Sequence, residues 1–214
     1  MSEGLYEKYF KRVFDFVFAV ILLLLTAPIL IICATAIKLE SKGPILFKQK
    51  RIGKNNQEFL IYKFRTMLVE TEKDGKALTD TERLTKVGRF LRKTSLDEIP
   101  QCINIIKGEM SFIGPRPLPV IYLPYYTDYE IQRHNVKPGI SGLAQVNGRN
   151  DLPWEERFRY DVEYVNNLSF KLDTQIFIRT IQKVLKRENI QIRGTTNIKD
   201  FHIYRQSQGK EGFS

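Results

Sequence analysis

Two adjacent carboxylates, Asp97 and Glu98, stand at the start of a helix that the sequence predicts from about Ser95 to Gly108. A carboxylate near the positive end of a helix is stabilised as an anion, so we expect Asp97 to be ionised at neutral pH. An ionised carboxylate can attack phosphorus, and the resulting acyl phosphate divides one difficult displacement into two easier ones. The alternative role is structural: Asp97 caps the helix, or Ser95 and Glu98 form a capping box.

Basic residues in several motifs could support this chemistry. Two anions repel each other, so a carboxylate can attack a phosphate only where arginines, lysines or a magnesium ion offset the charge. Arg116 lies between two prolines, which suits a phosphate clamp because its backbone loses little entropy on binding. The other candidates are Lys63 in YKFRTM, Arg92 before the acidic pair and Arg149 in VNGRN. Each of these cations has an alternative role in an ordinary ion pair.

Asp161 is a further acidic candidate, in the segment RYDVEY. Arg157 lies one helical turn earlier, so a local ion pair would explain this aspartate. The alternative is a role in binding substrate or a metal ion. We place Asp161 with the candidate substrate-binding residues.

The elements that must position these residues indicate an α+β fold that is mostly helical. Strand-like stretches from 45 to 50 and from 58 to 65 flank a turn at 53–56, which predicts a β-hairpin beside the helix of Asp97. An amphipathic helix is expected from Thr81 to Lys93, with its apolar face toward the core or its basic face at lipid headgroups. Two further helices are expected at 153–167 and 172–188, followed by a polar, loosely held tail.

An uncharged apolar run extends from Phe16 to Ile37. As a straight helix at about 1.5 Å per residue it would reach across a hydrocarbon core of about 30 Å, so we predict a membrane segment. Pro28, in its middle, favours a kink or a break. Basic residues flank the run on both sides, so charge asymmetry does not set an orientation. Two topologies stay open: a hairpin that returns to the same face, and a kinked helix that crosses.

The composition indicates an anionic partner. The 214 residues carry a formal net charge of +10, which favours a phosphorylated substrate, an anionic membrane or nucleic acid. We find no helix-turn-helix, zinc-finger or RNA-recognition signature, and the apolar run also argues against nucleic acid. Two cysteines and two histidines are too few for a disulfide framework or a histidine-rich metal site.

Several motifs occur together in a fixed order: YKFRTM, SLDEIPQ, GEMSFIGPRP, KPGISGLAQVNGR and RYDVEYV, after an apolar run with a central proline. This order, from about Lys11 to Lys186, resembles the bacterial sugar transferases, the monotopic polyprenyl-phosphate phosphoglycosyl transferases, in their minimal form. The resemblance implies transfer of a phospho-sugar from a UDP-sugar to a polyprenyl phosphate such as undecaprenyl phosphate, with release of UMP. It also implies the first membrane step of surface glycan or glycoprotein assembly.

The resemblance assigns roles to the candidate residues. Asp97 would attack the sugar-linked phosphate and carry the phospho-sugar covalently, with Glu98 as its catalytic partner. Magnesium is the implied cofactor, with Asp97 as its expected ligand. The implied phosphate-binding residues are Lys63, Arg92, Arg116 and Arg149. A membrane-tethered binding module without catalysis is the competing hypothesis, and it has the same charge and anchor.

The resemblance also favours a re-entrant anchor. Members of the family break this helix at a serine-proline pair, whereas this chain has Ala27-Pro28, so Pro28 alone marks the expected break. The implied organisation is a membrane anchor at 1–40, a catalytic domain at 41–188 and a polar tail at 189–214. The implied location is the cytoplasmic face of the bacterial inner membrane, in contact with its lipids, and a homodimer is left open.

Overall fold

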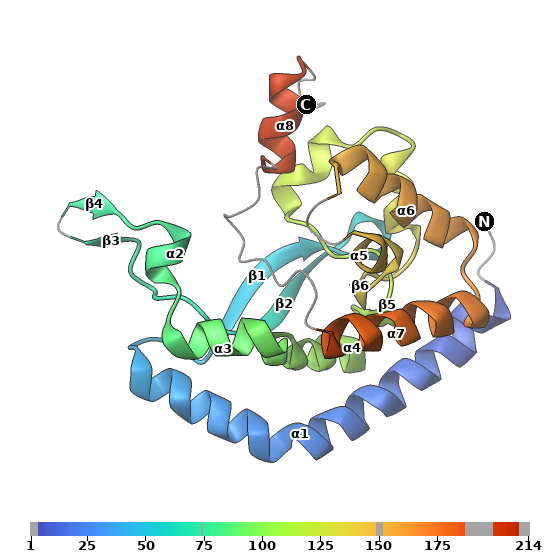
Figure 1. Ribbon diagram of the computed structural model, residues 1–214. Coiled ribbons are helices and arrows are strands. Elements are labelled where there is room, and N and C mark those ends of the chain that lie inside the picture. Colours follow the sequence, from blue (N-terminus) through green and yellow to red (C-terminus); the bar gives the residue numbers. More distant parts are fainter. Residues whose placement is uncertain (1–3, 74, 149–151, 187–198, 210–214) are drawn as a thin grey trace.

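The computed structural model describes residues 4–73, 75–148, 152–186 and 199–209 (Figure 1). Helices dominate this part of the chain, and its strands form three two-stranded sheets. The predicted α+β, mostly helical class is therefore confirmed. Figure 1 shows the long helix α1 (Arg12–Glu40) along one side of the molecule, with the other elements packed above it.

Helix α1 holds the predicted apolar run. It continues from a π-helical segment, η1 (Tyr6–Lys11), and Pro28 lies inside it. Proline removes a backbone donor and favours bending, and Figure 1 shows α1 bent near its middle. The helix is continuous, so the chain bends where we expected a break between two helices. Within the described residues, Tyr6–Glu40 is the one helix long and apolar enough to cross a membrane.

Both halves of α1 pack against the same body. In the first half, Ala19 is fully buried in a cluster that contains Ile105. In the second half, Ile37 is buried in a cluster with Phe64 and Leu91. Other large apolar side chains of α1 are exposed, among them Leu24, Leu25, Ile31 and Ile32. The helix is thus fixed to the body along one side and presents an apolar surface on the other.

The predicted β-hairpin is confirmed. Strands β1 (Leu46–Ile52) and β2 (Glu58–Phe64) are antiparallel, with Leu46 opposite Phe64 and Ile52 opposite Glu58. The turn contains a short 3₁₀ segment, η2 (Lys54–Asn56), in which Asn55 and Asn56 have positive φ. Asparagine tolerates this conformation better than most residues.

The segment after the hairpin differs from the prediction of one helix from Thr81 to Lys93. A small hairpin of β3 (Glu72–Lys73) and β4 (Lys76–Ala77) is followed by two helices, α2 (Asp80–Arg83) and α3 (Lys86–Thr94). The chain is extended between them because Leu84 is buried and forms a β-bridge with Met67. Thr85 then caps α3 by accepting a hydrogen bond from the Gly88 amide.

The helix predicted up to Gly108 ends there, but it has two parts. A 3₁₀ segment, η3 (Leu96–Gln101), leads into α4 (Cys102–Lys107), and Gly108 has a φ of 85°. Left-handed glycine is the common way to end a helix. The elements that follow are β5 (Ser111–Ile113), η4 (Val120–Tyr125), η5 (Glu130–Asn135), β6 (Gly139–Ser141) and α5 (Leu143–Asn147). Strands β5 and β6 are parallel.

The last helices are α6 (Trp154–Asn166), α7 (Phe170–Leu185) and α8 (Phe201–Ser207). The first two confirm the predicted helices. The expectation of a loosely held tail is wrong for α8, because Phe201 is fully buried in a cluster with Tyr122, Trp154 and Phe158. Residues 187–198 and 210–214 lie outside the described residues.

Candidate active site

Asp97 and Glu98 lie in the first turn of η3, directly after a sharp change of chain direction at Ser95. Ser95 has a φ of 57°, and its side chain makes no capping hydrogen bond. The predicted capping box of Ser95 and Glu98 is therefore wrong, and so is the prediction that Asp97 caps the helix, because Asp97 lies one residue inside η3. Neither acidic side chain therefore caps the helix, so capping does not explain why these two residues are acidic.

Glu98 is bound by two cations. Lys63 Nζ lies 2.6 Å from Glu98 Oε1, and the Arg116 guanidinium donates to the same oxygen at 2.5 Å. Burial alone would raise the pKa of Glu98, but Arg116 and Lys63 outweigh it and hold this pKa well below its ordinary range. Glu98 is consequently a permanent anion, and it fixes the position of both cations.

Asp97 has a different environment from its neighbour. It is half-buried, and in the described chain its carboxylate has neither a hydrogen bond nor an ion pair within 4 Å. Burial and the charge of Glu98 raise the pKa of Asp97 to about 6, against the opposing effect of Lys63, Arg92 and Arg116. We expected the helix N-terminus to keep the pKa of Asp97 low, but burial and Glu98 have the larger effect. Neighbouring carboxylates with divergent pKa values are a recurrent feature of catalytic sites.

The loop that carries Arg116 is tightly constrained. A Cβ atom on Gly114 would lie 2.4 Å from the carbonyl oxygen of Lys137, and one on Gly139 would lie 2.2 Å from the Gly114 nitrogen. These glycines let the GPRP and KPGISG segments meet backbone to backbone. Pro115 and Pro117 are both buried. The prolines and the close strand contact therefore aim Arg116 at Glu98.

Asp161 lies behind this loop. Its Oδ2 accepts hydrogen bonds from Arg133 at 2.8 and 2.9 Å, and both side chains are almost fully buried. Arg133 also donates to the carbonyl oxygen of Arg116 at 2.7 Å. The ion pair we expected with Arg157 is made with Arg133, although the Arg157 charge also acts on Asp161. In this position Asp161 supports the Arg116 loop, and its contact with substrate stays a prediction.

The remaining predicted residues divide into two groups. Arg92, on α3, donates to the hydroxyl of Thr66 at 3.0 Å and contributes to the potential at Asp97. A Cβ atom on Gly88 of the same helix would lie 1.9 Å from the Thr66 carbonyl oxygen, so this glycine lets α3 approach the YKFRTM motif. The structure thus brings Lys63, Arg92 and Arg116 around the acidic pair. Arg149 lies outside the described residues.

Arg133 is the important residue that the sequence did not indicate. Its partner Asp161 is 28 positions away and its other partner is a backbone carbonyl, so no local spacing could reveal either contact. A buried aspartate in an amphipathic helix was the available signal, because a buried carboxylate requires a cationic or hydrogen-bonding partner.

Residues 6–187 match the family model described as bacterial sugar transferase. The chain belongs to this family. The match covers most of the chain and includes all the residues that surround Asp97, so the resemblance drawn from the motifs is confirmed.

Relatives of this sugar transferase support the assignment. Uncharacterized sugar transferase EpsL of Bacillus subtilis (strain 168) is 49% identical over 181 residues, 85% of this chain and 90% of that protein. The UDP-glucose:undecaprenyl-phosphate glucose-1-phosphate transferase of Klebsiella pneumoniae is 43% identical over 185 residues, 81% of this chain but 40% of that protein. An enzyme of the same name from Caulobacter vibrioides is 40% identical over 192 residues, 84% of this chain and 71% of that protein. The chain thus spans less than half the length of the Klebsiella relative.

The magnesium site predicted for this sugar transferase depends on Asp97. Within the described residues there is no group of three or more His, Cys, Asp or Glu side chains that could enclose a metal ion. Magnesium often takes only one or two carboxylates and completes its shell with water and substrate phosphates. The unbonded carboxylate of Asp97 fits this mode, whereas Glu98 Oε1 is already shared by two cations.

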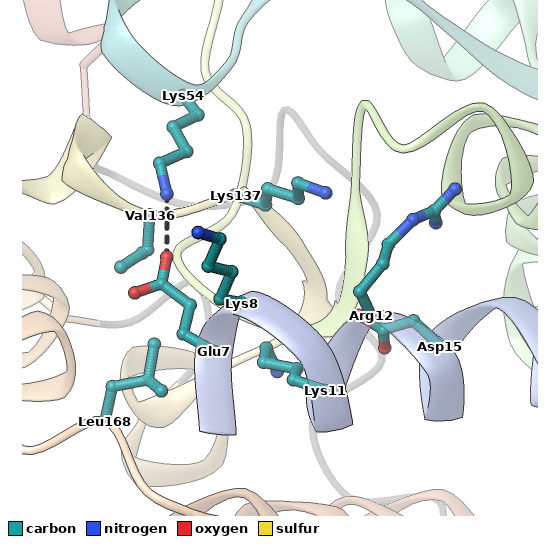
Figure 2. Close-up of a pocket in the computed structure, with 9 residues that line it drawn as sticks. All are labelled: Glu7, Lys8, Lys11, Arg12, Asp15, Lys54, Val136, Lys137 and Leu168. Atoms are coloured by element: carbon teal, nitrogen blue, oxygen red, sulfur yellow. Dashed lines mark hydrogen bonds and ion pairs between the residues drawn. The ribbon is translucent and has the colours of Figure 1, made fainter. Parts of the chain in front are cut away.

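A separate polar cavity of about 240 Å³ lies at the N-terminal end of the long apolar helix of the sugar transferase (Figure 2). Its basic residues are Lys8, Lys11, Arg12, Lys54 and Lys137. Lys54 pairs with Glu7 at 2.8 Å, as Figure 2 shows, and Arg12 donates to the carbonyl oxygens of Ile105 and Ile106. None of the residues that line this cavity contacts Glu98 through a hydrogen bond in the described chain. We interpret it as the polar attachment of the helix to the body.

Proposed function

We propose that this sugar transferase moves a phospho-sugar from a UDP-sugar to a polyprenyl phosphate of the undecaprenyl type and releases UMP. The observation that carries the proposal is the contrast at the acidic pair. Glu98 is neutralised by two cations, while Asp97 is half-exposed, unbonded in the described chain and within the field of three cations. Relatives with names that specify UDP-glucose and undecaprenyl phosphate support the same substrates.

In the first step, a carboxylate oxygen of Asp97 attacks the phosphorus that carries the sugar. The bond between that phosphorus and the oxygen bridging to UMP breaks, and UMP leaves with its electron pair. Lys63, Arg92 and Arg116 offset the negative charge that gathers on the phosphoryl oxygens, and Glu98 keeps two of these cations in place. The product is an aspartyl phospho-sugar.

In the second step, a phosphate oxygen of the polyprenyl phosphate attacks the same phosphorus. The bond to Asp97 breaks, the carboxylate is restored, and a polyprenyl diphosphate sugar leaves. Magnesium, held by Asp97 together with substrate phosphates, would supply further charge neutralisation when bound. Each step requires the anionic form of one oxygen nucleophile and the same set of cations.

We propose a re-entrant topology for α1, with both ends at the cytoplasmic face of the inner membrane. Arg12, at the N-terminal end, donates to the Ile105 carbonyl oxygen at 2.6 Å. At the C-terminal end, Arg65 donates to the carbonyl oxygen of Ser41 at 2.8 Å. A helix tied at both ends to one body has its two ends on one side of the bilayer. Single cysteines near residues 5 and 42 should therefore react with an impermeant reagent from the same side, and labelling from opposite sides would refute this topology.

Two measurements test the catalytic proposal. Wild-type protein incubated with a UDP-sugar and magnesium, without acceptor, should release one equivalent of UMP and gain the mass of one phospho-sugar. Asp97→Asn should do neither. The panel should include the UDP forms of glucose, galactose and N-acetylgalactosamine, the sugars that the relatives' names specify. Normal turnover by Asp97→Asn would remove the nucleophile from the mechanism, and absence of any adduct would favour the binding-module hypothesis.

A further inference from the structure

An open apolar groove lies between the second half of α1 and the start of the hairpin. Its volume is about 530 Å³, which lies within the range of about 300 to 1,000 Å³ typical of ligand sites. Residues from three elements line it: Leu30, Ile31 and Ala34 of α1, Pro44 to Leu46 and Lys48 at β1, and Phe64 of β2. Apart from Lys48, the lining side chains are apolar.

The groove is continuous with the apolar surface of α1. Ile31 lines it and is 66% exposed, and Ile32 beside it is also exposed. These side chains belong to the helix that is long and apolar enough to enter a bilayer. A hydrocarbon chain in the membrane could therefore enter the groove without crossing a polar surface.

One residue of the groove, Phe64, packs in the same cluster as a neighbour of Asp97. Phe64 lines the groove, and the residue before it, Lys63, binds Glu98. Phe64 also belongs to the cluster against which Leu96 packs, and Asp97 follows Leu96 in the chain. Successive side chains of a strand point to opposite faces, so Lys63 lies on the opposite face of the hairpin from Phe64, and the contact of Leu96 with the Phe64 cluster is the link from the groove to the acidic pair.

We infer that this groove binds the first isoprene units of the acceptor lipid, and this inference rests on the proposed function. An amphiphile with a phosphate at one end and a long apolar chain must place the phosphate near Asp97 while its chain stays in hydrocarbon. The groove opens on the apolar surface of α1, and Phe64 at its wall packs in the cluster of Leu96, the residue before Asp97. Lys48, exposed and close to the ring of Tyr62, adds a positive charge at the rim that suits a phosphate-bearing lipid.

The two-step reaction allows a selective test, because the acceptor enters only in the second step. Ala34→Trp fills the groove from α1, and Ala36→Trp is the matched control on the same helix, since Ala36 is also partly buried but does not line the groove. In both variants, adduct formation from the UDP-sugar should match wild type, which also shows that the protein is folded.

The two variants should differ in the second step, in which the acceptor reacts. Exclusion of even two buried methylene groups weakens binding roughly tenfold, so Ala34→Trp should raise KM for undecaprenyl phosphate by about that factor or more. Ala36→Trp should leave it within about twofold. Wild-type protein should prefer undecaprenyl phosphate to a prenyl phosphate with a single isoprene unit, which is too short to fill the groove, and Ala34→Trp should reduce this preference.

Each of the other outcomes would refute either acceptor binding in the groove or the proposed function. An unchanged KM in Ala34→Trp would overturn the inference. An equal rise in KM for undecaprenyl phosphate and for the single-isoprene acceptor would show that the substitution does not act through the isoprenoid chain, which also overturns the inference. Loss of adduct in Ala34→Trp alone would assign the groove to the donor step. Absence of adduct in wild type would refute the proposed function itself.

Discussion

Replacement of each adjacent carboxylate by its amide, Asp97→Asn or Glu98→Gln, should change the stability of the folded protein in opposite directions. Asp97 has a pKa of about 6, raised from 3.8 mainly by burial, so the folded protein binds this proton more tightly than the unfolded chain. The stabilisation from protonated Asp97 is fully present below about pH 3.8 and is lost as the pH rises through about 6. At pH 8 the folded protein therefore contains a poorly solvated anion.

Asp97→Asn removes that anion. A rise in pKa from 3.8 to about 6 corresponds to about 3 kcal/mol, and the partial exposure of Asp97 reduces the expected gain to about 2 kcal/mol. For a chain of 214 residues, this is a rise in Tm of roughly 4 to 8 °C. The gain should be seen at pH 8 and should nearly vanish at pH 4, while adduct formation is lost.

Glu98→Gln provides the matched comparison. Its carboxylate stabilises two cations, and Lys63 and the less buried Arg116 would both lose their partner. We expect destabilisation by about 2 kcal/mol at pH 8. Thermal unfolding of both variants in detergent at the two pH values tests the reasoning. A gain for Asp97→Asn that is equal at pH 4 and pH 8, or a loss at pH 8, would refute the idea that Asp97 is a desolvated anion.

Three further predictions follow from the same contacts. The rate of adduct formation at saturating UDP-sugar should fall about tenfold for each pH unit below 6 as Asp97 is protonated, and a flat profile down to pH 4.5 would contradict this. Arg133→Gln should destabilise the protein by about 3 to 5 kcal/mol because it leaves Asp161 buried without its charged partner, whereas Arg159→Gln, which breaks an exposed pair, should cost less than about 1 kcal/mol in denaturant unfolding. Phe201→Ala should cost about 3 to 5 kcal/mol, and a cost no larger than that of the exposed Ile203→Ala would show that α8 does not pack on the core.

Local signals predicted the elements whose ends depend on nearby residues. The turn residues at 53–56 correctly predicted the hairpin, and Gly108 correctly predicted the end of α4. Predictions failed where distant residues decide the backbone. Leu84 leaves the helical conformation because it is buried and bridges to Met67, and the left-handed conformation of Ser95 has no local signal.

The candidate site followed a similar pattern. Charge and spacing identified Lys63, Asp97, Glu98 and Arg116, which the structure brings together. They could not reveal that Glu98 is the residue bound by the cations and that Asp97 is left free of hydrogen bonds within the described chain. That distinction depends on the direction of η3 relative to β2, which is a tertiary property.

The proposed re-entrant topology would fix the depth of Asp97 relative to the membrane, because few contacts separate this residue from α1. The residue before it, Leu96, packs in the same apolar cluster as Cys33 and Ile37 of that helix. Because Arg12 and Arg65 fix both ends of α1 to the body, the helix cannot slide in the bilayer without moving Asp97 by the same amount. A lipid phosphate has its own fixed depth at the headgroup layer, so in the proposed mechanism this rigid connection would hold Asp97 at one depth relative to the acceptor phosphate. Under this proposal the acceptor would reach the site by lateral diffusion, with its long chain kept in the hydrocarbon.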